Sequence, residues 1–109
     1  MNKKKLLILA ASRYQVPVIT TAKRLGYYVI TTDNKPDNPG HALADNRYFI
    51  DTTNRKAVLD IAEREDIDGI IAAGTDVAVP TSAYVAETLG LPGVPLDSAE
   101  IVCDKVSFR

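Results

Sequence analysis

The sequence of 109 residues contains no tryptophan, one cysteine and one histidine. A single cysteine, Cys103, excludes an internal disulfide, and with the lack of a clear secretory signal it favours the reducing cytoplasm. Cys103 and His41 are also too few soft ligands for a zinc site. We therefore expect no metal site, a buried and inert thiol at Cys103, and an exposed loop position for His41.

Strong charge of one sign and long apolar runs are also missing. The formal net charge is −1, so no overall basic field would draw the chain to nucleic acid or to an anionic membrane. No segment approaches the ~20 apolar residues that cross a bilayer. Three lysines before an apolar run imitate a secretory signal, but the run is shorter than the ~7–15 residues required. We expect a cytoplasmic protein that binds neither nucleic acid nor membranes.

The most informative stretch of the sequence is residues 6–15, Leu-Leu-Ile-Leu-Ala-Ala-Ser-Arg-Tyr-Gln. An apolar run that stops abruptly at small and polar residues is typical of a strand buried on both faces of a parallel sheet. In open parallel sheets, ligands bind just beyond the carboxyl ends of the strands. The residues from Ala11 to Gln15 are therefore expected where a ligand would lie.

The remaining chain alternates strand and helix patterns. Further strands are predicted at 28–32, 47–51 and 68–73, with a short strand or extended segment at 91–94. Helices are predicted at about 15–25, from Thr53 or Asn54 to about 64, from between Val77 and Pro80 to Leu89, and from Asp97 or Ser98 onward. This alternation predicts one α/β domain of Rossmann-like three-layer type, with a mostly parallel sheet of four to five strands and the first strand at its centre.

A long loop at residues 33–45 separates the second and third strands. It contains two prolines, one glycine, two asparagines and three aspartates, which is loop chemistry. A loop of this length in a compact domain is usually functional or disordered.

A dinucleotide site is disfavoured by the absence of glycine in the first turn. The fingerprint Gly-x-Gly-x-x-Gly lets the backbone approach a pyrophosphate, but residues 10–15 are Ala-Ala-Ser-Arg-Tyr-Gln. Asp33 stands where a ribose-binding acid would, yet alone it is a weak signal. A phosphate loop of the Gly-Lys-Ser/Thr type is also absent from the sequence.

Polar residues follow three of the predicted strands, at ends that share one edge of a parallel sheet. They are Ser12, Arg13, Asp33, Thr75 and Asp76. A helix N-terminus adds partial positive charge there, which suits a carboxylate or a phosphate. Taken singly, the serine, the threonine and the second aspartate more often cap helices, and the first aspartate more often starts a turn. Only their convergence favours a binding site.

Two segments carry a family resemblance. Residues 37–41 (Asp-Asn-Pro-Gly-His), which lead to Ala44-Asp45, and the ending at 103–109 (Cys-Asp-Lys-Val-Ser-Phe-Arg) resemble the N-terminal (pre-ATP-grasp) domain of ATP-grasp enzymes. Members include biotin carboxylase, carbamoyl phosphate synthetase and the glycinamide-ribonucleotide synthesis ligases. The resemblance covers the whole chain. It implies a substrate-side domain at 1–103, and a junction at 104–109 in which Lys105 contacts ATP.

The resemblance also implies a reaction. The parent enzyme would use Mg-ATP to activate a carboxylate or bicarbonate as an acyl phosphate, which an amine then captures. The five strand-end residues would face the substrate. Ala10 stands where many relatives have glycine, which limits how closely a ligand can approach. ATP and Mg²⁺ are expected in the full-length parent. The ATP-grasp lobes would follow Arg109, so we expect this chain to be a fragment that holds no cofactor, does not catalyse, and has the missing domain as a partner, with a homodimer possible in the family.

An alternative from another class remains open. The chain could be a stand-alone Rossmann-like module that binds a small ligand or a partner without catalysis. Titration with Mg-ATP and with candidate acceptors separates the two hypotheses, because only the first assigns nucleotide binding to residues outside this domain.

Overall fold

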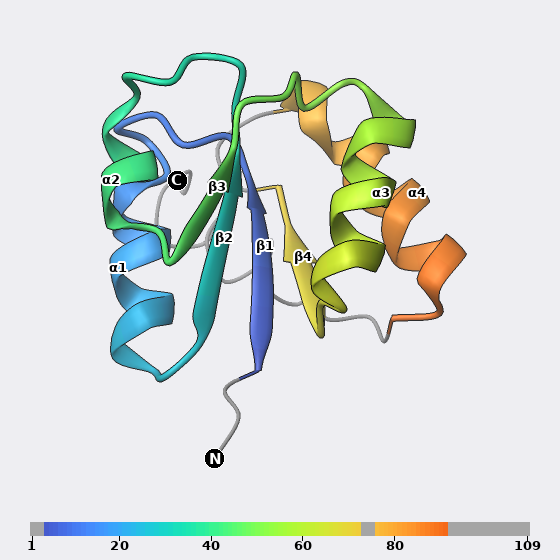
Figure 1. Cartoon of the computed structure of the whole chain (residues 1–109), viewed down its shortest axis with the longest axis horizontal. Coiled ribbons are helices and arrows are strands. Elements are labelled where there is room, and N and C mark those ends of the chain that lie inside the picture. The colour runs from blue at the N-terminus through green and yellow to red at the C-terminus, as the bar shows by residue number, and fades with distance from the viewer. Residues whose placement is uncertain (1–3, 73–75, 92–109) are drawn as a thin grey trace.

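The computed structural model describes residues 4–72 and 76–91. In that part of the chain, four parallel strands form one sheet in the order β3-β2-β1-β4. The strands are β1 (Lys5–Leu9), β2 (Tyr28–Thr32), β3 (Asn46–Tyr48) and β4 (Gly69–Ile71). Strand β1 lies inside the sheet, between β2 and β4, as Figure 1 shows. The predicted parallel α/β fold with an interior first strand is confirmed.

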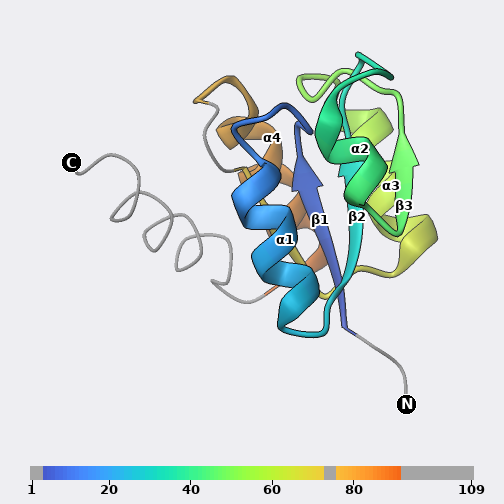
Figure 2. The same cartoon turned by 90° about the vertical axis from the view of Figure 1, so that its left-hand side faces the viewer.

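Helices cover both faces of the sheet. Helices α1 (Val16–Arg24) and α2 (Pro39–Leu43) lie on one face (Figure 2). Helices α3 (Arg55–Glu65) and α4 (Val79–Leu89) lie on the other, and the short 3₁₀ turn η1 (Asp76–Ala78) precedes α4. None of the described helices is long and apolar enough to span a membrane.

Local sequence signals account for the helix ends. Pro17 lies in the first turn of α1, where its missing N–H costs no helical hydrogen bond. The side chain of Asn54 caps α3 by accepting the N–H of Ala57 at 3.2 Å. Gly90 ends α4 in the left-handed conformation, with φ of 67°, and Gly26 after α1 also has a positive φ. Each of these ends was predicted.

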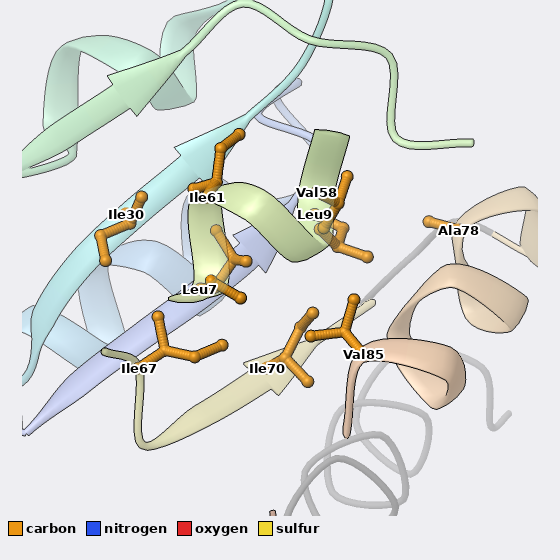
Figure 3. Packing of buried hydrophobic residues seen from close by; sticks show 10 residues of the cluster. Leu7, Leu9, Ile30, Val58, Ile61, Ile67, Ile70, Ala78 and Val85 are labelled. Carbon is orange, nitrogen blue, oxygen red and sulfur yellow. The ribbon is translucent and has the colours of Figure 1, made fainter. Parts of the chain in front are cut away.

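The alternation of side chains along β1 divides the core in two. Leu7 and Leu9 face α3 and α4, where they pack with residues such as Ile30, Val58 and Val85 (Figure 3). Leu6 and Ile8 face the opposite layer, in the cluster that contains Ile19 of α1. Because both faces are covered, β1 is apolar at every position from 6 to 9, and burial of each such side chain stabilises the fold by roughly 1.5–3 kcal/mol.

An aspartate lies just before each of the two outer strands of the sheet, β3 and β4. The N–H of Asp45 donates to the carbonyl of Val29, and its carboxylate accepts the N–H of Val29, both at 2.8 Å. Asp68 makes the same pair of 2.8 Å contacts with the N–H and carbonyl of Lys5. Each carboxylate therefore adds one rung to a ladder that has only three residues in the edge strand.

Three predictions about elements need correction. The third strand is Asn46–Tyr48, not 47–51, and the fourth ends at Ile71. The loop at 33–45 contains helix α2, which Pro39 begins with the fixed φ of a first-turn proline. Of the expected segment at 91–94 only Leu91 is described, and it lies in no helix or strand; the last helix and Cys103 lie outside the described residues.

Candidate substrate-binding site

Two loops meet at the carboxyl edge of the sheet, after β1 and after β2 (Figure 1). Leu9 pairs with Thr32 at the ends of these strands, and the N–H of Ala10 then donates to the carbonyl of Thr32 at 2.7 Å. Ala10 has a φ of 78°, a left-handed value that costs an L-residue roughly 1–2 kcal/mol. Backbone strain of this kind often accompanies a functional site, and here it turns the chain away from β1 toward Ser12.

The carboxylate of Asp33, in the loop after β2, holds the loop after β1 in place. It accepts the N–H of Ala11 at 3.0 Å, the N–H of Lys35 at 3.0 Å and the side-chain amide of Asn38 at 2.9 Å. The residue is only 8% exposed. Asp33 therefore lies at the predicted edge of the sheet, with its oxygens already bonded to donors of its own chain.

Ser12 and Gln15 are hydrogen-bonded to each other in the turn before α1, whose N-cap residue is Gln15. The Oε1 atom of the buried Gln15 side chain accepts the N–H of Ser12 at 2.9 Å and also its hydroxyl hydrogen. The Ser12 Oγ in turn accepts the N–H of Tyr14 at 3.3 Å. The half-buried hydroxyl of Ser12 therefore orders the turn before α1 and does not cap the helix itself.

Arg13 is the exposed cation of this loop. Its Nη2 donates to the hydroxyl of Tyr14 at 3.3 Å, and its guanidinium carbon lies 5.1 Å from the centre of the Tyr14 ring. The Tyr14 side chain is itself 66% exposed. Among the described residues Arg13 makes no ion pair. A guanidinium held over an aromatic ring and free of carboxylates can bind a phosphate or a carboxylate in a bidentate manner.

The structure brings together part of the predicted site. Ser12, Arg13 and Asp33 lie on adjoining loops, and they are joined through the backbone of Ala11. Asp76 begins η1, but its side chain lies outside the described residues, as do Thr75 and Lys105. The roles of all six residues in binding stay predictions.

His41 is buried, so the expectation of an exposed loop residue is wrong. Helix α2 turns its ring onto the sheet, where it is 2% exposed. Its Nδ1 lies 2.9 Å from Oγ1 of Thr31, and its ring meets Phe49 edge to face at 5.1 Å. Burial lowers the pKa of His41 and outweighs the backbone and carboxylate of Asp33, which raise it; Arg47 lowers it further.

This lowered pKa predicts a loss of stability in acid. The unfolded chain takes up a proton at His41 near pH 6.5, whereas the folded chain takes it up only at a lower pH. The contribution of His41 to the free energy of unfolding should therefore be complete above pH 6.5 and be lost as the pH drops through the folded-state pKa. Because His41 is the only histidine, NMR titration of its ring reads this pKa directly.

A variant and the titrated pKa itself test this prediction. In His41→Gln, which has no imidazole, the part of the acid dependence that begins near pH 6.5 should disappear. A folded-state pKa at or above 6.5 would contradict the prediction.

Within residues 4–72 and 76–91, no three histidine, cysteine or acidic side chains are placed to hold a metal ion together. Mg²⁺ usually takes only one or two protein carboxylates together with substrate phosphates, so this finding concerns only sites built from three such side chains. We assign no step of any reaction to a metal held by this part of the chain.

The sequence interpretation missed Asn38 and Gly40. Asn38 donates to Asp33, and the N–H of Gly40 donates to the carbonyl of Ala11 at 2.6 Å. The available signal was the Asn-Pro-Gly run inside the long loop, where a glycine can mark a close approach of two backbones.

Comparisons with known proteins agree with this architecture. A family profile described as the ATP-grasp N-terminal domain matches residues 19–93. The formate-dependent phosphoribosylglycinamide formyltransferases of Paraburkholderia xenovorans and Nitratiruptor sp. are 28% and 34% identical to the chain, over 88% and 86% of it. The crystal structure of phosphoribosylglycinamide synthetase from Anaerococcus prevotii matches 84% of the chain with a TM-score of 0.75 and 29% identity.

These matches cover only part of each relative. The aligned region is 28% and 24% of the two formyltransferases, and 23% of the synthetase chain. The chain thus spans about a quarter of the length of the curated relatives it matches.

Proposed function

The chain belongs to the ATP-grasp N-terminal domain family, and on this premise we propose that it forms the acceptor-substrate side of an ATP-dependent ligase. In the proposed reaction, ATP phosphorylates a carboxylate and ADP leaves. The amine nitrogen of the acceptor then attacks the acyl carbon of the acyl phosphate, inorganic phosphate leaves, and the nitrogen loses a proton. The domain binds and orients the acceptor for the second of these steps.

The observation that carries this proposal is the exposed guanidinium of Arg13 at the carboxyl edge of the sheet. The names of the matched relatives refer to phosphoribosylglycinamide, a compound with a phosphate and an amine. A phosphate held by Arg13 would anchor such an acceptor through charge-assisted hydrogen bonds. We therefore propose a phosphorylated amine as the acceptor class.

The remaining parts of the reaction are assigned to other residues of the enzyme. The family resemblance gives Lys105 a contact with ATP, and the matched relatives are about four times as long as the aligned region. We propose that ATP and Mg²⁺ bind in those other parts, that this domain docks against them, and that it does not catalyse alone. The single cysteine of the sequence favours the cytoplasm as its location.

Replacing Arg13 with alanine should weaken acceptor binding. Loss of hydrogen bonds between a guanidinium and a phosphate costs about 1.5–3 kcal/mol, which is roughly a 10- to 100-fold rise in Kd. Isothermal titration of the purified chain with phosphoribosylglycinamide measures the change. Arg24→Ala is the matched control, because Arg24 is an exposed cation in the last turn of α1, at the opposite end of that helix.

Equal Kd values for the wild-type chain and Arg13→Ala would contradict the proposed site. A second titration, with Mg-ATP, tests the proposal that the nucleotide binds to other parts of the enzyme. Micromolar binding of Mg-ATP by this chain would overturn the assignment of the nucleotide to other parts of the enzyme. Binding of inorganic phosphate as tightly as phosphoribosylglycinamide would favour the stand-alone module.

A further inference from the structure

We propose that the segment 33–40 is a clamp that fixes the direction of the Arg13 loop, and that Asn38 and Gly40 are positioning residues. They would act through the backbone of Ala11 and not by touching a ligand. The clamp is inferred from hydrogen bonds within the chain. Its effect on ligand binding rests on the proposed function of Arg13.

Ala11 is the residue on which the clamp closes. Its N–H donates to Oδ2 of Asp33 at 3.0 Å, and its carbonyl accepts the N–H of Gly40 at 2.6 Å. The residue is fully buried and directly precedes Ser12. Because both backbone polar groups of Ala11 are held by the loop after β2, that loop sets the path by which the chain leaves β1 toward Arg13.

Asn38 supports the clamp in an unusual way. It is the N-cap residue of α2, with extended φ and ψ of −62° and 138°, but its side chain makes no capping hydrogen bond. Asparagine is among the preferred N-cap residues because its oxygen normally accepts a free helical N–H. Here its Nδ2 instead donates to Oδ2 of Asp33 at 2.9 Å, the same oxygen that accepts from Ala11. The amide therefore orients the carboxylate that holds the loop.

Gly40 lets the two backbones touch. A Cβ atom at this position would lie 2.5 Å from the carbonyl oxygen of Ala11 and 2.7 Å from Cδ1 of Ile19. Any larger residue would therefore push α2 away from Ala11 and lengthen the hydrogen bond between Gly40 and Ala11. Gly40 is buried and Asp33 is 8% exposed, so both act on the loop through the chain's own backbone.

The test compares Asn38→Ala with Asn34→Ala in the purified chain. Asn34 is an exposed residue of the same loop, and among the described residues its side chain makes no hydrogen bond. The first readout is hydrogen exchange of the Ala11 amide, measured by NMR against the amide of Leu7 in the core. The second is the Kd for phosphoribosylglycinamide.

In Asn38→Ala we expect the Ala11 amide to exchange about tenfold faster, with Leu7 unchanged. The Kd should rise by a similar factor, and Asn34→Ala should match the wild type in both readouts. An unchanged Ala11 amide would overturn the clamp. An equal acceleration at Ala11 and Leu7 would also overturn it, since that result means general destabilisation.

The two readouts separate this inference from the proposed function. If the wild-type chain does not bind phosphoribosylglycinamide, the proposed acceptor is wrong, but exchange at Ala11 still decides whether the clamp exists. If the acceptor binds and Asn38→Ala loosens Ala11 without changing Kd, the clamp does not position the binding loop.

Discussion

Replacing Gly40 with alanine should lower the free energy of unfolding by about 2–3 kcal/mol, within the range for overpacked interiors. The added Cβ would overlap the carbonyl oxygen of Ala11 and the end of Ile19. The side chain of Ile19 can rotate, but the backbone of Ala11 is held by Asp33 and cannot yield cheaply. Urea unfolding at neutral pH measures the change.

Gly26→Ala is the control for this experiment. A Cβ at Gly26 meets no atom within 4 Å, although its φ of 94° disfavours alanine. The expected cost there is backbone strain alone, about 1 kcal/mol. A loss at Gly40 no larger than the loss at Gly26 would show that α2 moves away from Ala11 freely.

Tyr48→Phe should lower the free energy of unfolding by about 1.5–3 kcal/mol, the usual contribution of a hydrogen bond to a charged group. The Tyr48 hydroxyl and Nδ2 of Asn46 both donate to Oε2 of Glu65, a carboxylate whose residue is 9% exposed. Nζ of Lys5 lies 3.9 Å from the other oxygen. Removing the hydroxyl leaves a nearly buried charge with one donor fewer.

A double-mutant cycle with Glu65→Gln measures the part of this contact that depends on the carboxylate charge, because the amide oxygen of glutamine can still accept the hydroxyl hydrogen. Unfolding of the two single variants and the double variant should give a coupling energy above zero, and strictly additive effects would contradict the prediction. Tyr14→Phe serves as the control, because the exposed Tyr14 should change stability by less than about 0.5 kcal/mol.

The same contact predicts behaviour in alkali. Burial and the neighbouring Glu65 raise the pKa of Tyr48 above its ordinary value of 10.0. The neutral phenol is thus favoured in the folded chain. Its contribution to stability is complete below pH 10 and is lost as the pH rises through the raised pKa.

The fold could be predicted because its signals are local. The apolar run of β1 and the β-branched run of β2 each identify a buried strand from neighbouring residues alone. Capping at Asn54 and the glycines after α1 and α4 are equally local. The register of the strands then brought the loops of Ser12 and Asp33 to one edge, as expected.

The interior of the site could not be predicted in the same way. Helix α2 has five residues, too few for helix propensity to reveal it, and tertiary packing decides its formation. His41 and Gly40 are buried by that packing. The hydrogen bond between Asp33 and Ala11 joins residues 22 positions apart, so nothing in the neighbouring sequence indicated that this carboxylate was already occupied.

Asp45 and Asp68, which precede the outer strands β3 and β4, have a consequence for protein engineering. A three-residue strand has few hydrogen bonds with which to resist sliding, and a slip of one residue would exchange the faces of its side chains. Each carboxylate grips one fixed N–H, Val29 or Lys5, and so defines a single register. New loops could therefore be grafted at the carboxyl ends of the strands, because the aspartates fix the register at the amino ends. Both aspartates would have to be retained.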